Sequence, residues 1–144
     1  MQNQRRAVAH ILGGSEYECL SGKIEFYQSK NGVWVIANVG GLPENETGFF
    51  AMHIHDGSSC SGENFSETGS HYNPENVKHP LHSGDLPPLL ASNGNAYMAV
   101  LTNRFTVDEI MGKTVVIHMD YDDFTSQPAG NAGDKIACGV IKSI

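Results

Sequence analysis

The stretch GKIEFYQSKNGVWVIANVGGL (residues 22–42) carries the strongest fold signal in the sequence. Its two halves, 22–28 and 32–42, are rich in β-branched and aromatic residues, which favour β-strands. Between the halves lies Asn31-Gly32, a dipeptide typical of tight hairpin turns. The stretch therefore predicts two antiparallel strands joined by a hairpin.

Similar short runs occur on both sides of this hairpin. The further predicted strands are 7–12, 95–101, 113–120 and 136–141. Only TVDEIMG (106–112) has helical character, with Thr106 as the N-cap and Gly112 at its end. Short strands separated by turn signals predict an all-β protein, either an antiparallel sandwich or a Greek-key barrel.

Length and composition exclude several classes of protein. The 144 residues suit one domain, spanning 1–144, and no apolar run approaches the roughly 20 residues of a membrane span. The net charge is −7 and the nine Lys and Arg residues are scattered, so neither nucleic acid nor a membrane is an expected partner. The first residues lack the apolar stretch of a secretory signal. We therefore expect a cytoplasmic protein, or a periplasmic or secreted one if a signal has been removed.

Histidines give the sequence its functional signal, because six of the seven lie between residues 53 and 118. In FFAMHIH (49–55), His53 and His55 share one face of a strand, and Ile54 faces the other side. In TVVIHMD (114–120), His118 likewise faces away from its apolar neighbours. If the two strands are adjacent, three imidazoles meet on the outer wall of the barrel. Neutral imidazole suits copper and zinc.

Two long segments without strand or helix periodicity, 56–94 and 121–134, hold more candidate ligands. Loops of this length in a compact domain are usually functional or disordered. Three imidazoles and one carboxylate can form a closed tetrahedral site, which zinc favours. The first loop offers such a set in His71, His79, His82 and Asp85. A carboxylate from Asp122 or Asp123 could then orient metal-bound imidazoles by accepting their N–H groups.

Five stretches of the sequence resemble the copper/zinc superoxide dismutase family. They are MHIHDGSSCS (52–61), TGSHYNP (68–74), KHPLHSGDLPPL (78–89), VVIHMDYDDF (115–124) and AGNAGDKIACGVI (129–141). The GDLPPL motif and the cysteine-bearing loop after His55 are most similar to bacterial members. The resemblance implies an eight-stranded Greek-key β-barrel, an immunoglobulin-like sandwich with two long functional loops, which agrees with the predicted strands.

The resemblance also implies a role for individual residues. The implied copper ligands are His53, His55, His71 and His118. The implied zinc ligands are His71, His79, His82 and Asp85, so that His71 bridges both metals. Asp122 is implied to link His53 to His79, and Cys60 and Cys138 to form a disulfide. Cys19 has no counterpart in the family, and we expect it to be a free, partly buried thiol.

The implied activity is dismutation of superoxide to oxygen and hydrogen peroxide by ping-pong redox cycling of copper. Zinc would support the bridging His71, which carries a proton in the family mechanism. The expected small-molecule partner is the superoxide anion. The sequence leaves a homodimer and a copper donor open as further partners.

The sequence departs from the family in its charged residues. Lys135 stands where the family has an anion-positioning arginine, so the charge is kept but the planar multi-donor fork is lost. Residues 119–134 contain four aspartates and no lysine, so the usual steering charges are absent there. An alternative hypothesis therefore stays open: a copper/zinc-binding protein on the same scaffold that buffers or delivers copper with poor dismutase activity. A zinc-binding structural domain without copper ranks third, because no copper ligand is lost.

Overall fold

The computed structural model describes residues 5–144 of the chain. Its longer strands are β1 (Arg6–Gly13), β2 (Ser21–Ser29), β3 (Gly32–Gly40), β7 (Ala96–Thr102), β8 (Thr114–His118) and β9 (Lys135–Ser143). Its shorter strands are β4 (Phe49–Phe50), β5 (Met52–His55) and β6 (Leu89–Leu90). Its helices are η1 (Glu63–Thr68) and α1 (Val107–Ile110). The predicted strands and the predicted helix are confirmed, whereas β6 and η1 lie in a segment predicted to be loop.

The predicted hairpin forms between β2 and β3, which pair antiparallel along their whole length. Its turn is at Lys30 and Asn31, one residue before the predicted position. Gly32 has a φ of +138°, and a β-carbon there would lie 2.5 Å from the backbone oxygen of Thr102 on β7. The glycine is therefore required by the close approach of a third strand as well as by the turn.

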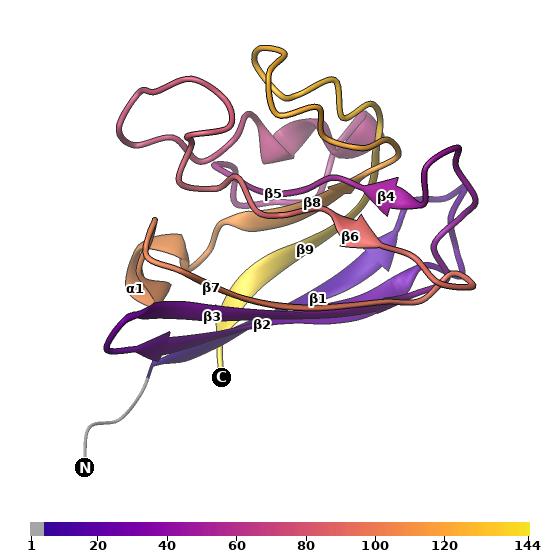
Figure 1. The fold of residues 1–144 in the computed structure, drawn as a ribbon. Coiled ribbons are helices and arrows are strands. Elements are labelled where there is room, and N and C mark those ends of the chain that lie inside the picture. The colour runs from indigo at the N-terminus through magenta and orange to yellow at the C-terminus, as the bar shows by residue number, and fades with distance from the viewer. Residues whose placement is uncertain (1–4) are drawn as a thin grey trace.

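Seven strands form one curled antiparallel sheet in the order β5-β8-β9-β1-β2-β3-β7. In Figure 1, β1, β2, β3 and β7 form the lower layer, and β5 and β8 lie above them. β4 and β6 pair with each other, and β6 contacts β7 on the open side of the sheet. Because only Ala51 separates β4 from β5, counting these two as one interrupted strand gives eight strands. The prediction of an all-β Greek-key barrel is confirmed.

The core fills the space between the two layers. Alternate residues of β2 and β3 point inward, among them Ile24, Phe26 and Val35, and each is fully buried. From the opposite layer, Ile54 of β5 and Ile117 of β8 are also fully buried. Burial of each such side chain contributes about 1.5–3 kcal/mol to stability. β5 and β8 therefore present their apolar side chains to the core and their histidines to the outside of the barrel.

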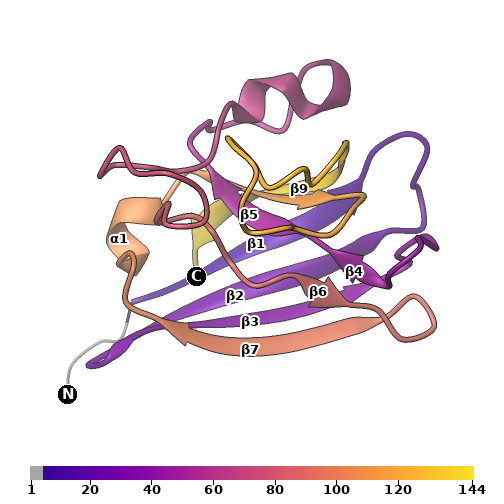
Figure 2. The ribbon, with the colours of Figure 1, turned by 45° about the horizontal axis from the view of Figure 1, so that its top comes forward.

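Two long loops cover the outer face of β5 and β8. The first runs from Asp56 to Pro88 and contains η1, and the second runs from Met119 to Asp134. Figure 2 shows η1 and the loops gathered on this one side of the barrel, away from β2 and β3. A disulfide between Cys60 and Cys138 ties the first loop to β9. Among residues 5–144, no helix is both long and apolar enough to cross a membrane.

Candidate metal centre

Three of the histidines come from the neighbouring strands β5 and β8. These strands pair antiparallel, with Ile54 opposite Val115, so the adjacency that the sequence left as a condition is met. Because side chains alternate along a strand, His53, His55 and His118 project from the outer face. They are nevertheless buried, because the two long loops lie over them. The site is therefore an interior site on the outside of the barrel wall.

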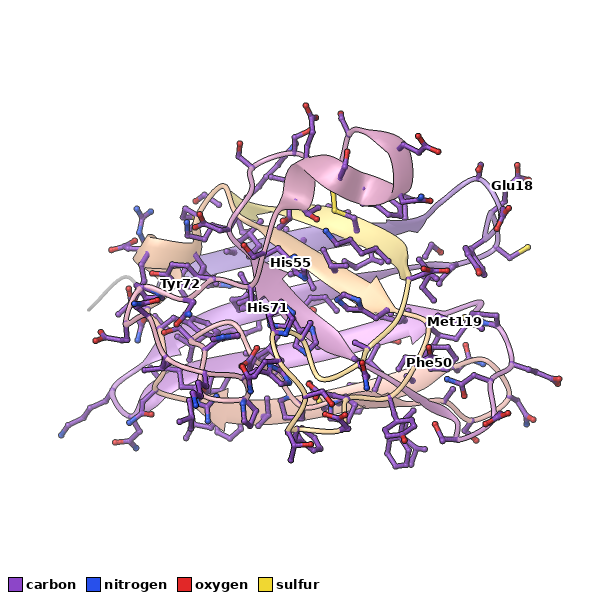
Figure 3. The ribbon with its side chains drawn as sticks, turned by 90° about the horizontal axis from the view of Figure 1, so that it is seen from above. Glu18, Phe50, His55, His71, Tyr72 and Met119 are labelled. Carbon is purple, nitrogen blue, oxygen red and sulfur yellow. A yellow bond between two sulfur atoms is a disulfide. The ribbon has the colours of Figure 1, made fainter. Side chains whose placement is uncertain are left out.

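The first loop adds His71 to this group. His71 and His55 form an isolated β-bridge, and the Tyr72 N–H donates to the Ile54 carbonyl at 2.8 Å. In Figure 3, His55 and His71 lie beside each other near the middle of the molecule. One ring nitrogen from each of four histidines lies within 4.8 Å of the other three. These four are His53, His55, His71 and His118.

A second group forms on the other side of the His71 ring. His71 Nδ1 lies 2.8 Å from Asp85 Oδ1 and 3.1 Å from His82 Nδ1. His79 Nδ1 lies 3.0 Å from the other oxygen of Asp85. The structure thus brings together every residue of the two predicted ligand sets. His71 is common to both groups; its Nδ1 atom faces Asp85 and His82, whereas its Nε2 atom has no hydrogen-bond partner.

Backbone carbonyls fix the tautomers of two of these imidazoles. His55 Nδ1 donates to the Gly69 carbonyl at 2.8 Å, and His118 Nδ1 donates to the Gly133 carbonyl at 3.1 Å. Because a carbonyl oxygen only accepts, each proton sits on Nδ1 and each Nε2 carries a lone pair. The two Nε2 atoms are 3.4 Å apart. Two lone pairs at this distance repel each other, and a cation between them removes the repulsion.

The Asp122 carboxylate fixes two more tautomers. It accepts from His53 Nε2 at 2.8 Å and from His79 Nε2 at 2.7 Å, one on each oxygen. Both Nδ1 atoms of these rings, and the Nε2 atom of His71, are buried without a hydrogen-bond partner. The 3.0 Å approach of His79 Nδ1 to Asp85 sets a lone pair against an oxygen and is not a hydrogen bond. Leaving a buried polar atom unpaired costs about 1–3 kcal/mol. Unpaired nitrogens that converge with their lone pairs fit copper or zinc ions.

Burial lowers the pKa of four of the clustered imidazoles, those of His53, His55, His82 and His118. It lowers the pKa of His55 to about 2 and the pKa of His118 to about 3. Burial by itself raises the pKa of Asp122, but hydrogen bonds from His53 and His79 more than reverse this and bring that pKa to about 2. Neutral imidazoles and ionised carboxylates are the forms that bind metal ions. The donor set is therefore ready for metals at neutral pH.

Lys135, at the start of β9, borders a cavity that leads to the first group. The cavity has a volume of about 740 Å³, and its walls include His55, His118 and Gly133. Lys135 Nζ donates to Thr68 Oγ1 at 2.7 Å and to the Gly69 carbonyl at 3.1 Å. A cationic group therefore stands in the wall of the cavity that the His55 and His118 side chains also line.

Some residues that build the site carry no signal in the sequence. The Gln127 side chain donates to the His79 carbonyl at 2.7 Å and accepts from the His79 N–H at 2.9 Å, which joins the two loops. Arg104 Nη1, from the segment after β7, donates to the Pro80 carbonyl at 2.6 Å. Such contacts join residues far apart in sequence, so no local pattern could reveal them. Asp123, the other candidate carboxylate, accepts instead from Ser126.

The cysteines follow the expected pairing with one correction. Cys60 and Cys138 form the disulfide, and Cys19 is free. Cys19 is exposed, however, so the expectation of a partly buried thiol was wrong. It lies in the connection from β1 to β2, where the next residue, Leu20, takes the inward-facing position and is buried.

Comparisons with known proteins place the chain in one family. The family model for copper/zinc superoxide dismutase (SODC) matches residues 20–141. A superoxide dismutase [Cu-Zn] of Aquifex aeolicus is 37% identical over 136 residues, covering 84% of this chain and 78% of the relative. One from Legionella pneumophila is 36% identical, covering 84% and 77%. One from Arabidopsis thaliana is 34% identical, covering 94% and 89%. The chain therefore belongs to the copper/zinc superoxide dismutase family.

Proposed function

We propose that the protein dismutates superoxide, converting two superoxide anions and two protons into oxygen and hydrogen peroxide. The observation that carries the proposal is the arrangement of two groups of ligand atoms on opposite sides of His71. One of these groups opens to a cavity whose wall holds a lysine ammonium. Relatives with names that specify this activity support the proposal.

In this proposal each group holds one metal. His53, His55, His71 and His118 hold copper. His71, His79, His82 and Asp85 hold zinc, since a closed set of three imidazoles and a carboxylate suits that ion. Copper, when bound, supplies the redox chemistry by accepting an electron from one superoxide and returning it to a second. The protein contributes ligand geometry, proton delivery and the placement of the anion.

His71 is the proposed proton carrier. Its Nε2 atom is buried and has no hydrogen-bond partner, while its Nδ1 atom faces Asp85 and His82. The Nε2 atom can therefore hold a proton while the ring stays fixed through Nδ1. This proton, with a second one from solvent, completes hydrogen peroxide when the second superoxide is reduced.

Lys135 is the proposed anion-positioning group. The chain carries 16 acidic and nine basic residues, so its overall field repels an anion. A cation in the cavity wall offsets this repulsion over the last few ångströms. Because lysine lacks the rigid fork of arginine, we expect superoxide to be oriented less firmly and the rate to be lower than with arginine.

The direct test is superoxide decay by protein with measured copper and zinc contents. The assay compares the wild type with Lys135→Arg and Lys135→Met at low and high salt. We expect rapid copper-dependent decay, faster in the arginine variant and slower in the methionine variant. Decay no faster than that of the same copper held by a small chelator would contradict dismutation. That result would leave the copper-buffering or copper-delivering hypothesis, which no contact among the described residues favours.

A further inference from the structure

The ammonium group of Lys135 is held by two acceptors from one turn of the first loop. Lys135 Nζ lies 2.7 Å from Thr68 Oγ1 and 3.1 Å from the Gly69 carbonyl oxygen. An ammonium has three N–H groups. These two contacts use two of them and leave one for a molecule in the cavity.

Thr68 is itself held firmly. Its side chain is completely buried, and its O–H donates to the Phe65 carbonyl at 2.7 Å. Since its only proton is used there, Thr68 Oγ1 meets Lys135 with its lone pairs. The Thr68 carbonyl also accepts from the Gly57 N–H at 2.8 Å. The hydroxyl oxygen is therefore a fixed acceptor in a fixed orientation.

The other acceptor connects the lysine to the histidine cluster. The Gly69 carbonyl accepts from His55 Nδ1 at 2.8 Å as well as from Lys135. The Cys60–Cys138 disulfide holds this loop to β9, the strand from which Lys135 projects. The ammonium group, its two acceptors and one proposed copper ligand thus form one connected unit.

A lysine in this place needs an anchor more than an arginine does. A guanidinium is planar and presents five donors in a rigid fork, whereas an ammonium is a point charge on a flexible four-carbon stem. Without the Thr68 hydroxyl, the Gly69 carbonyl would be the only acceptor among the described residues that holds the Lys135 ammonium. It could then rotate away from the cavity at little cost in free energy.

We propose that Thr68 is a positioning residue, which fixes the Lys135 ammonium so that its remaining N–H faces a small anion beside the copper ligands. This inference rests on the proposed function, because superoxide is the anion to be oriented. Thr68 acts only through Lys135 and does not contact the substrate. It compensates for part of the geometry that lysine lacks in comparison with arginine.

The test uses protein loaded with copper and zinc, and azide as the anionic probe, whose binding is followed by the visible spectrum of copper. Thr68→Val removes the hydroxyl at nearly constant volume, and Thr68→Ser keeps it. Because the hydroxyl is one of the two acceptors that hold the Lys135 ammonium, we expect Thr68→Val to weaken azide binding roughly tenfold. We expect a comparable loss of kcat/KM for superoxide, and recovery to within about twofold in Thr68→Ser.

A second background separates positioning of the lysine from general support of the loop. In Lys135→Met protein the group on which Thr68 acts is gone, so adding Thr68→Val should not weaken azide binding further. If Thr68 only supported the loop, Thr68→Val would lower azide affinity by the same factor in the wild-type and Lys135→Met backgrounds. Thr68→Ala serves as a second hydroxyl-free variant if Thr68→Val does not fold.

The outcomes separate this inference from the proposed function. Normal turnover and wild-type azide binding in Thr68→Val would overturn the inference and leave dismutation intact. Equal losses with and without Lys135 would overturn it too. Absence of turnover in the wild type, together with azide binding that depends on Thr68 only when Lys135 is present, would support anion positioning while contradicting dismutation.

Discussion

Gly130 passes so close to Asp122 that a β-carbon on Gly130 would lie 2.0 Å from the Asp122 Oδ1 atom. The same carbon would lie 2.7 Å from His79 Nε2, the atom that donates to that oxygen. Gly130 also has a φ of +71°, which favours glycine. The second loop therefore depends on a glycine to pass behind the carboxylate that joins the two ligand groups.

Gly130→Ala is expected to displace the Asp122 carboxylate and to weaken metal retention. The positive φ alone costs about 1–2 kcal/mol, and the collision adds to this. Gly112→Ala is the matched control, because Gly112 has a φ of +81° but no atom lies within 4 Å of its added β-carbon. Denaturant unfolding should show the larger loss for Gly130→Ala, and metal analysis after dialysis should show zinc loss only there. Equal zinc retention in both variants would contradict the steric argument.

Asp122→Asn tests the bridge itself. The carboxylate accepts two N–H groups, from His53 and His79, but an amide has a single oxygen and its NH₂ group would face an imidazole N–H. We expect copper and zinc affinities to fall about 10–100-fold, as for other residues that orient metal ligands. Competition with chelators of known affinity measures both metals.

The neighbouring residue supplies the control for this variant. Asp123 accepts from Ser126 and Thr125 and does not contact the bridge. Asp123→Asn therefore removes one negative charge from the same loop without disturbing the histidines. If Asp123→Asn weakens metal binding as much as Asp122→Asn does, the loss reflects loop charge and not the bridge.

Loss of the disulfide should loosen the loop that carries Thr68 and Gly69. The cross-link joins residues 78 apart in sequence, and removal of a native disulfide typically costs about 2–5 kcal/mol. We expect Cys60→Ser to lower the denaturant midpoint of metal-free protein and to lower azide affinity in loaded protein. Cys19→Ser should change neither, because that thiol is exposed and unpaired in the described structure. A Cys60→Ser protein with the wild-type midpoint would show that the loop is held by its other contacts.

The pH profile should report on Lys135. Burial lowers the pKa of Lys135 below its ordinary value of 10.5. The ammonium is charged below that pKa, so anion positioning is complete near neutrality and is lost as pH rises through the lowered pKa. The kcat/KM of the wild type should therefore fall at a lower alkaline pH than that of Lys135→Arg, because arginine stays protonated. Coincident profiles for the two proteins would show that another group controls the alkaline decline.

Much of the candidate site was predictable because its proposed ligands follow local rules. The spacing of His53 and His55 places both on one face of any strand, and the apolar residues between and beside them identify the other face as the core side. The Thr106 cap of α1 was equally local, and the structure shows its capping box with Glu109. The expectation that failed, partial burial of Cys19, concerned a turn, where no periodicity tells which side chain faces inward.

The sequence by itself determined the longer strands, the hairpin between β2 and β3, and which side chains could bind metals, since these follow from residue type and the two-residue period of a strand. Only the tertiary structure decided that the outward-facing histidines are buried beneath two loops. The same structure determined that Asp122 accepts hydrogen bonds from His53 and His79. It also decided that Thr68 meets Lys135 across 67 positions of sequence. The physical reason is that tautomers, desolvation and anchoring depend on atoms brought together by chain folding, and no local pattern encodes those distances.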